Sequence, residues 1–518
     1  MAWPISSLDP VESVSDPELS PLFRPLEDLL VCGGDGRLAV GSPGRENIYG
    51  CSPFPRPERI DFASSTASSI STEALARVSA SRGTLLVNAL SAGVEAAFGA
   101  AVAATSATLL SHLRLAGSGT KVVFAPSGTD AQLCTLFLAR ALLAKPVTTI
   151  VAGSDQTGSG TAYTSMGRHF SQTTAAGWGV EKGGTITGLG EDANGVEIGF
   201  CRPDGSFRSA NEMDEALIRA VDEAVGQDRS VLLQAMEASK FGWKAPSDAV
   251  LDLIAARHAG RVQIVVDACQ LRTPRARLKE MLAKGYCVLI TGSKFFTGPA
   301  FSGALLVPGS LSDRIVTLNA TPAGLAGYSS AYDWPMGWKG LRRHFPLRPN
   351  FGQWLRWEAA LEEMKLYYAV PEEVRSRLKE EFQRELEAGI AKAPGLDLLP
   401  VRGMPLPTVF GVILKSESGP LSADIVANIY HAMKRAEPVE NMELRPCLLG
   451  QPVALPALGT AALRIGLSAR LIRQCWSEDA HESAKKRFAM FQNLSFAVER
   501  LDRLAQDAGK IAQGQKII

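Results

Sequence analysis

The segment Ile290-Thr-Gly-Ser-Lys-Phe-Phe-Thr-Gly-Pro-Ala-Phe-Ser-Gly303 decides the fold class, because it places a lysine directly after an apolar strand. Residues 287–291 have the composition of a buried strand, and the Gly-Pro and Ser-Gly pairs turn the chain into another apolar run at 303–307. A lone lysine usually lies on the surface, but apolar sequence on both sides of Lys294 opposes that interpretation. Burial lowers the pKa of a lysine, and a neutral amine can form a Schiff base. Lys294 is therefore a candidate catalytic residue.

An acidic residue ends another apolar strand upstream, in Val265-Val-Asp-Ala-Cys-Gln270. A carboxylate there costs free energy unless it has a cationic partner, and a protonated pyridine nitrogen is one such partner. The alternative is that backbone N–H groups satisfy Asp267. Gln270, three residues further on, could donate a hydrogen bond to a phenolic oxygen of the same bound group.

A third motif, Pro126-Ser-Gly-Thr-Asp-Ala131, joins the apolar run 121–125 to a helical stretch at 130–143. Gly128 allows close approach of the backbone, Ser127 and Thr129 offer hydroxyls, and a helix start favours a phosphate. The alternative is a simple helix cap. Each of the three motifs lies at the C-terminal end of a predicted strand, and in open α/β sheets ligands bind at that edge.

Short apolar runs alternate with helical patterns through the first two thirds of the chain, which predicts a mostly parallel sheet covered on both faces. The predicted strands are 121–125, 147–152, 231–235, 262–267, 287–291 and 303–307, and the predicted helices lie at 70–113, 130–143, 247–258 and 274–283. After residue 340 we expect helices at 351–367, 371–391 and 422–435, strands at 408–414 and 462–467, and a charged C-terminal helix. These patterns predict an N-terminal arm (1–55), a large domain (56–340) and a smaller C-terminal α+β domain (341–518).

Composition excludes several other classes of protein. The formal net charge of +1 gives no case for nucleic acid or an acidic membrane surface. Eight cysteines without CxxC spacing predict neither a metal site nor a disulfide framework, and indicate a reducing compartment. The acidic N-terminus lacks the apolar core of a signal peptide, and the apolar stretch 85–110 is expected to be a buried helix. These features predict a cytoplasmic protein.

The motifs SGTDA, VVDACQ and TGSKFFTGPAFSGAL, in this order, resemble the class V aminotransferase branch of the fold type I enzymes that depend on pyridoxal 5′-phosphate (PLP). That branch includes cysteine desulfurases, and the resemblance covers about residues 60 to 475. It implies PLP as the cofactor and the PLP-transferase fold, with a mostly parallel seven-stranded sheet in the large domain. Each motif alone is weak evidence for this family, but the three motifs together are specific for it.

The resemblance also implies roles for individual residues. Lys294 is similar to the Schiff-base lysine, Asp267 to the partner of the pyridine nitrogen, and Gln270 to the residue beside the phenolic oxygen. Arg464, in Ala462-Leu-Arg-Ile-Gly-Leu-Ser468, resembles the arginine that binds the substrate carboxylate, for which its planar fork is suited; the alternative is a surface ion pair. The positions similar to the family's phosphate-binding residues are Ser127, Gly128, Thr129, Thr291 and Ser293.

The sequence departs from the family pattern in two places. Ser293 precedes the lysine where desulfurases often have histidine, and the loop 153–160 has no aromatic residue to stack on the cofactor ring. Gln156, Thr157, His169 and Trp178 are the candidates to cover the ring. In the arm, Asn47 and Tyr49 are candidate substrate contacts, with a plain turn as the alternative.

We therefore expect a PLP-dependent enzyme acting on an amino acid, foremost an aminotransferase that also uses a keto acid. A cysteine desulfurase or C–S/β-lyase is an alternative, with Cys447 as nucleophile on a loop before Arg464; the other interpretation of Cys447 is a buried apolar residue. A non-catalytic binding module is a further alternative, opposed by the Lys, Asp and Arg set. We also expect a homodimer, because the irregular segment 321–352 carries aromatic residues that would be costly to expose. They are Tyr328, Trp334, Trp338 and Phe351.

Overall fold

A seven-stranded sheet forms the centre of the computed structural model, which describes residues 19–41, 45–435 and 445–512. The strand order is β2-β8-β7-β6-β5-β3-β4. The bounds are β2 Lys121–Ala125, β3 Val147–Ala152, β4 Asn194–Ile198, β5 Ser230–Met236, β6 Val262–Ala268, β7 Cys287–Thr291 and β8 Gly303–Val307. Six of the seven were predicted within a residue. The prediction missed β4, an edge strand whose sequence Asn-Gly-Val-Glu-Ile is only partly buried and has few apolar residues.

The strand directions bring the three motifs to one edge of this sheet. Strands β4, β3, β5, β6 and β7 pair in parallel, whereas β8 is antiparallel to both β7 and β2. Two antiparallel pairings in succession restore the direction, so that β2 runs the same way as β6 and β7. The mostly parallel sheet is thus confirmed, and the segments that follow β2, β6 and β7 all lie at its carboxyl edge.

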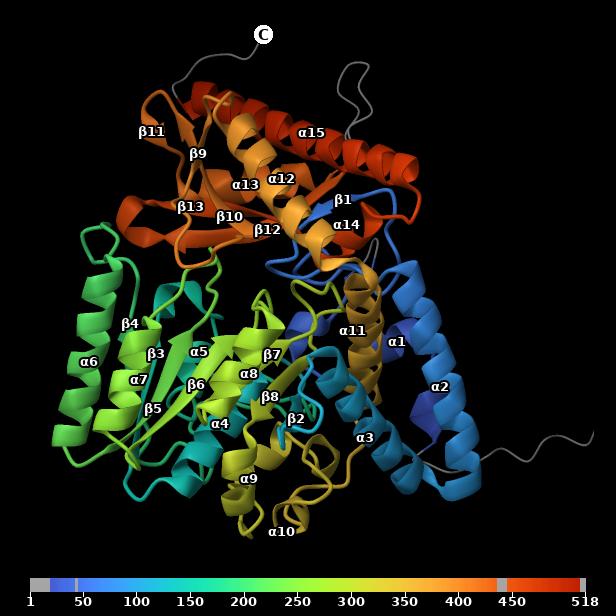
Figure 1. Cartoon of the computed structure of the whole chain (residues 1–518), viewed down its shortest axis with the longest axis vertical. Helices are drawn as coiled ribbons and strands as arrows, with labels where there is room; N and C mark the ends of the chain where they lie inside the picture. The colour runs from blue at the N-terminus through green and yellow to red at the C-terminus, as the bar shows by residue number, and fades with distance from the viewer. Residues whose placement is uncertain (1–18, 42–44, 436–444, 513–518) are drawn as a thin grey trace, which may run out of the picture.

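Helices cover both faces of the large sheet, as expected for buried parallel strands. Figure 1 shows α6, α7 and α8 in front of the strands and α4 behind them. The bounds are α4 Gly128–Leu142, α5 Thr161–Thr164, α6 Ala210–Gly226, α7 Asp248–Arg257, α8 Arg275–Ala283, α9 Gly309–Ile315 and α10 Lys339–Arg342. Ser127, Ser209 and Ser247 cap α4, α6 and α7 through their side chains.

A second sheet lies over the carboxyl edge of the first (Figure 1). Its order is β1-β12-β13-β10-β11, with β9 also paired to β10. The strands are β1 Ile60–Phe62, β9 Leu396–Leu398, β10 Val409–Ser416, β11 Gly419–Pro420, β12 Cys447–Leu455 and β13 Thr460–Gly466. Helices α12 (Glu372–Ile390), α13 (Ala423–Met433), α14 (Ala469–Gln474) and α15 (Ala480–Ala512) complete this part. This is the predicted smaller α+β part, although β1 comes from the N-terminal third of the chain.

The expected domain limits at residues 55 and 340 stay predictions. Two segments pack against elements that lie on the other side of the limit at 340. The strand β1 pairs in parallel with β12 of the second sheet. The helix α11 (Phe351–Ala369) packs against α2 (Thr72–Ala92) and α3 (Val94–His112). The described part of the arm is not simply extended, since it holds α1 (Leu26–Leu30) and the 3-10 turns Ser20–Phe23 and Gly36–Leu38.

The prediction of one buried helix over 85–110 is wrong in two respects. Gly93, at φ 81°, breaks the stretch into α2 and α3, and one side of both helices is exposed, including Val87 at 67% and Leu90 at 64%. By length and composition alone α3 could cross a membrane. Its inner face packs on α11, where Thr105 Oγ1 donates to Glu358 Oε1 at 2.7 Å. The helix is therefore an integral part of the folded domain.

The aromatic residues of 321–352 pack inside their own chain, which corrects the reason given for a dimer. Trp334 stacks on Phe345 at 5.1 Å, and Phe351 meets Phe98 edge-on at 5.1 Å. Tyr328, Trp334, Trp338 and Phe351 are 2–5% exposed. Phe345 lies in the same segment, but Phe98 and Phe137, which meets Trp334 edge-on at 5.9 Å, come from distant parts of the chain. The sequence pattern could not reveal these distant contacts.

Candidate active site

A cavity of about 300 Å³ lies between the two sheets, at the carboxyl edge of the larger one. Ten of the eleven predicted site residues line it: Tyr49, Ser127, Gly128, Thr129, Asp267, Gln270, Thr291, Ser293, Lys294 and Arg464. The eleventh, Asn47, does not. Its side-chain oxygen accepts hydrogen bonds from the amides of Tyr49 and Cys51, which is the plain turn that was the alternative for this residue.

Lys294 lies three residues beyond β7, with its side chain on the cavity wall. Burial lowers the pKa of its amine, and Arg464 and Arg272 lower it further, while Cys269 and Asp267 oppose the shift. No hydrogen bond or ion pair holds the amine to another residue in the described part of the chain. The geometry therefore leaves Lys294 with a free amine of enhanced nucleophilicity.

Asp267 lies near the end of β6 and is 7% exposed. The amide of Cys269 donates to its Oδ1 at 3.0 Å, and no cationic side chain pairs with it within the described ranges. Gln270 is held by the chain, since its Nε2 donates to Ser65 O at 3.1 Å and its Oε1 accepts from Arg272 Nε at 3.2 Å. A buried carboxylate with one backbone donor is suited to a cationic nitrogen on a ligand.

The start of α4 provides backbone donors at the same cavity. A Cβ added to Gly128 would lie 2.7 Å from Cys269 Sγ, so only glycine fits this close approach. The Ser127 hydroxyl caps α4 by accepting from the amide of Asp130, and Thr291 Oγ1 donates to Cys269 O at 2.6 Å. The helix N-terminus is thus free to bind an anion through its first amides, with Thr129 and Ser293 beside it on the cavity wall.

Arg464 projects from β13 into the cavity and is 3% exposed. Four hydrogen bonds orient its guanidinium: Nε and Nη2 donate to Gln451 O, Nη1 to Ser65 O, and Nη2 to Thr66 Oγ1. No acidic side chain pairs with it in residues 19–41, 45–435 or 445–512, so it is not the surface ion pair that was the alternative. Burial lowers its pKa to about 10, which leaves it charged at neutral pH. A buried cation without an anion is suited to a ligand carboxylate.

Cys447 is not on a loop. It begins β12, pairs with Ile60 across the sheet, is fully buried, and does not line the cavity. Burial raises the pKa of its thiol to about 11, so a thiolate nucleophile is disfavoured there. The sequence pattern concealed β12 because its Gly and Pro residues are typical of a turn; a bulge between Gly450 and Val453 accommodates them.

The open question of the ring-covering residue is answered in part by the cavity wall. Gln156 and Thr157, which follow β3, lie on it. His169 instead bonds through Nδ1 to the hydroxyl of Tyr328 at 2.6 Å, and Trp178 is 49% exposed. Gln156 and Thr157 are therefore the candidates that reach the site.

The sequence reasoning missed two basic residues of the cavity. Arg37, from the arm, pairs with Asp35 at 2.6 Å and lies over the ring of Phe301 at 4.8 Å. Lys240 lies four residues beyond β5. Its signal was in the sequence, since it follows a fully buried apolar strand as Lys294 does. Arg37 gave no such signal, because it follows a glycine-rich stretch of the arm.

Taken together, the cavity offers a nucleophilic amine, a buried carboxylate, a helix N-terminus and a buried guanidinium. Comparison with solved structures finds the cystine C-S lyase C-DES with its product cysteine persulfide, at TM-score 0.52, 15% identity, 85% of this chain and 98% of that chain. A C-DES variant with glycine covalently linked to the PLP cofactor matches with a TM-score of 0.50 and 14% identity, and the match covers 84% of this chain and 97% of that chain. Mouse CSAD in apo form matches with a TM-score of 0.50 and 17% identity, and the match covers 87% of this chain and 84% of that chain.

The chain has the fold of fold type I PLP enzymes. Sequence identities of 14–17% show that the chain shares this fold, and they do not show which reaction it catalyses. No protein-family model matches the sequence, and no curated protein matches it. The predicted PLP-transferase fold is thus confirmed by structure, and the roles of the cavity residues stay predictions.

Proposed function

We propose that the protein is a PLP-dependent enzyme that acts on an amino acid through a Schiff base at Lys294. The observation that carries this is the meeting of Lys294, Asp267 and Arg464 on one cavity wall, brought from β7, β6 and β13. Neither Asp267 nor Arg464 has an oppositely charged partner within the described residues, and a ligand with a cationic nitrogen and a carboxylate satisfies both.

The donor set fits PLP group by group. The start of α4 would hold the phosphate through its free amides, and Gly128 permits the close approach. Asp267 would keep the ring nitrogen protonated, and Gln156 and Thr157 line the same cavity. Bound PLP supplies an electron sink for the substrate Cα. Lys294 would hold the cofactor and could move a proton at the substrate Cα, while Arg464 would orient the carboxylate.

For the reaction, we propose transamination between an amino acid and a keto acid, as the class V resemblance implies. A desulfurase that uses Cys447 is not proposed, because that thiol is buried in β12. Cys269 lines the cavity, but burial raises the pKa of its thiol well above its usual value. A C–S lyase that needs no cysteine nucleophile is the second candidate, favoured only by the overall fold likeness to C-DES.

The test is to mix the purified, PLP-treated protein with single amino acids and follow the visible absorbance. A transaminase converts to the aminated cofactor and recovers on addition of a keto acid. A C–S lyase releases sulfide from cysteine or cystine, with no need of a keto acid. A protein whose spectrum stays unchanged with every amino acid contradicts the proposed function and supports the binding module.

We also propose a homodimer in the cytoplasm. The support for the dimer is the exposed apolar side of α2 and α3, with Val87 and Leu90, because large exposed apolar patches mark interfaces. The support for the compartment is that all eight cysteines are unpaired thiols.

A further inference from the structure

Lys240 is a second lysine in the cavity, and nothing in the proposed reaction uses it. It lies on the cavity wall in the loop after β5, and three strands separate β5 from β2 in the sheet order. Its ammonium group has no ion pair or hydrogen bond with any residue of the described ranges. A cation placed on a cavity wall without an anion is suited to an anionic group on a ligand.

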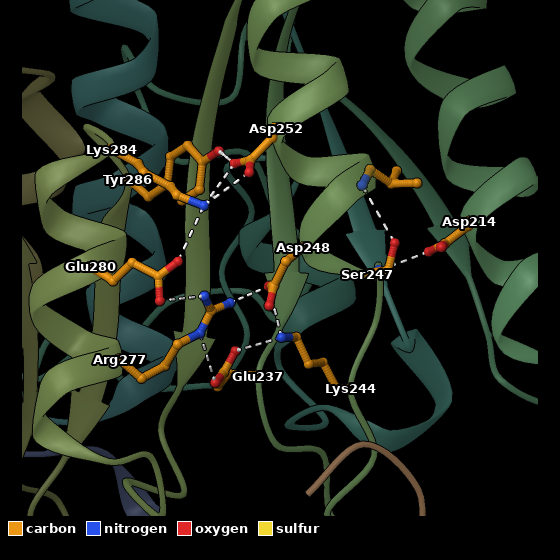
Figure 2. Close-up of polar contacts among 11 residues, drawn as sticks. Asp214, Glu237, Lys244, Ser247, Asp248, Asp252, Arg277, Glu280, Lys284 and Tyr286 are labelled. Atoms are coloured by element: carbon orange, nitrogen blue, oxygen red, sulfur yellow. Dashed lines mark hydrogen bonds and ion pairs between the residues drawn. The ribbon is translucent and has the colours of Figure 1, made fainter.

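Lys240 lies between Glu237 and Lys244, and Figure 2 shows the ion pairs of these two residues. Glu237, at the start of the loop, accepts from Arg277 Nε at 3.4 Å, and Lys244 donates to Asp248 Oδ1 at 2.7 Å. Between these ion pairs, Trp243 is fully buried. The loop is therefore fixed against α7 and α8, and Lys240 is kept facing the cavity.

Gln156 adds a second unsatisfied donor next to Lys240. Its Oε1 accepts a hydrogen bond from Ser239 Oγ, and its backbone oxygen accepts from the amide of Lys240 at 3.2 Å. Its Nε2 is buried and has no partner among the described residues. A buried amide left unpaired costs about 1–3 kcal/mol, and a ligand acceptor would remove that cost. The ammonium and the amide thus form a donor pair from two adjacent loops.

The charges of the cavity leave Lys240 without an assigned partner. Asp267 is the single acid among the lining residues, and the proposed function pairs it with the ring nitrogen. The same proposal gives Lys294 to the cofactor aldehyde and Arg464 to the α-carboxylate. Arg37 is neutralised by Asp35. Of the four basic residues on the wall, Lys240 alone has no partner assigned to it.

We propose that the substrate carries a second anionic group on its side chain, as a dicarboxylic amino acid does, and that Lys240 and Gln156 bind it. This inference rests on the proposed function, which assigns the α-carboxylate to Arg464. The competing arrangement is that Lys240 joins Arg464 on the α-carboxylate, and the experiment below separates the two.

The protonation of Lys240 gives the inference a pH dependence. Burial, with Arg464 and Lys294 nearby, lowers the pKa of Lys240 to about 7, while Asp155 opposes the shift. The protonated lysine attracts the second anion, so this part of the affinity is present below pH 7 and lost as the pH rises through 7. A bound anion raises the pKa of Lys240, so its binding takes up a proton near neutral pH.

The experiment measures two unreactive ligands by calorimetry at pH 6 on the PLP-treated protein. Succinate has two carboxylates and butyrate has one on a chain of equal length. We expect tighter binding of succinate. Lys240→Met should weaken succinate roughly 10- to 150-fold, the range of a charged hydrogen bond, and leave butyrate unchanged. Lys240→Arg should keep the preference for succinate. Lys279→Met, which removes an exposed lysine of α8, is the matched control and should change neither ligand.

Two results overturn the inference. If Lys240→Met weakens the binding of succinate and of butyrate equally, Lys240 binds the α-carboxylate. If the affinity for succinate is unchanged, Lys240 does not bind the ligand. If the variant does not fold, the wild-type protein can be tested by calorimetry at pH 7 in buffers that differ in ionisation enthalpy. The dependence of the binding enthalpy on the buffer gives the number of protons taken up when each ligand binds. Succinate should then take up a proton and butyrate should not; equal uptake contradicts the inference.

The visible band of the Lys294–PLP bond separates this failure from failure of the proposed function. A Lys240→Met protein that keeps the band with unaltered succinate binding refutes the inference alone. A wild-type protein that forms no band refutes the proposed function, whatever its preference between the two ligands.

Discussion

Replacing Arg464 with lysine separates the charge of this side chain from its geometry. Lysine keeps the positive charge, but its three donors share one nitrogen, whereas the guanidinium spreads its donors over a planar fork. In the structure that fork reaches Gln451 O, Ser65 O and Thr66 Oγ1 at 2.8–3.1 Å. No single ammonium position can reproduce all of these contacts.

The structure predicts two separate losses. The affinity for a substrate carboxylate should fall by about 1.5–3 kcal/mol, the range of a charged hydrogen bond. The free energy of unfolding should also fall, by about 1–3 kcal/mol for each buried acceptor left without a donor. Four of the five N–H groups of Arg464 already donate hydrogen bonds to the chain. The remaining N–H group, on Nη1, is free to donate to a ligand.

The assay compares an amino acid with the amine that lacks its carboxylate. Wild-type protein should prefer the amino acid, and Arg464→Lys should lose most of that preference while its thermal unfolding midpoint falls. The reasoning is wrong if wild-type protein reacts equally well with both compounds. It is also wrong if Arg464→Lys binds the amino acid as tightly as the wild type.

Three further outcomes are expected. Asp267→Ala should lose far more turnover than cofactor, because the start of α4 still holds the phosphate; unchanged turnover would refute the role of Asp267. Cys447→Ser should keep its activity, since the thiol lies in β12 away from the cavity, and an inactive but folded variant would argue against that placement. Sedimentation should find a dimer, and charged substitutions at Val87 and Leu90 should dissociate it; an unaffected dimer would exclude this face.

The fold could be predicted from the sequence where a local pattern determined it. The strands β2, β3, β5, β6, β7 and β8 are short, apolar and bounded by turn residues, so their limits were found almost to the residue. The strands β4 and β12 were missed, because one has few apolar residues and the other contains Gly450 and Pro452. In both, the pairing with neighbouring strands outweighs a weak local preference.

The candidate site followed the same division. Lys294 and Ser127 follow apolar strands and Asp267 lies near the end of one, and these strands share a direction. Their meeting could therefore be expected from the topology rule for parallel sheets. Arg37 and Gln451 come from the arm and the second sheet, and no local pattern relates them to that edge. The contacts of Trp334 with Phe137 and of Phe351 with Phe98 are likewise long-range, which is why these residues were wrongly expected at an interface.

The central claim is that Lys294 carries the cofactor, and borohydride reduction followed by peptide mass mapping tests it most directly. PLP-treated wild-type protein should be yellow, reduction should fix the added mass on the peptide containing Lys294, and Lys294→Ala should carry no fixed mass. A stable mass increase on another lysine, Lys240 included, would show that Lys294 does not carry the cofactor, as would a Lys294→Ala protein that stays yellow after dialysis and is still reduced.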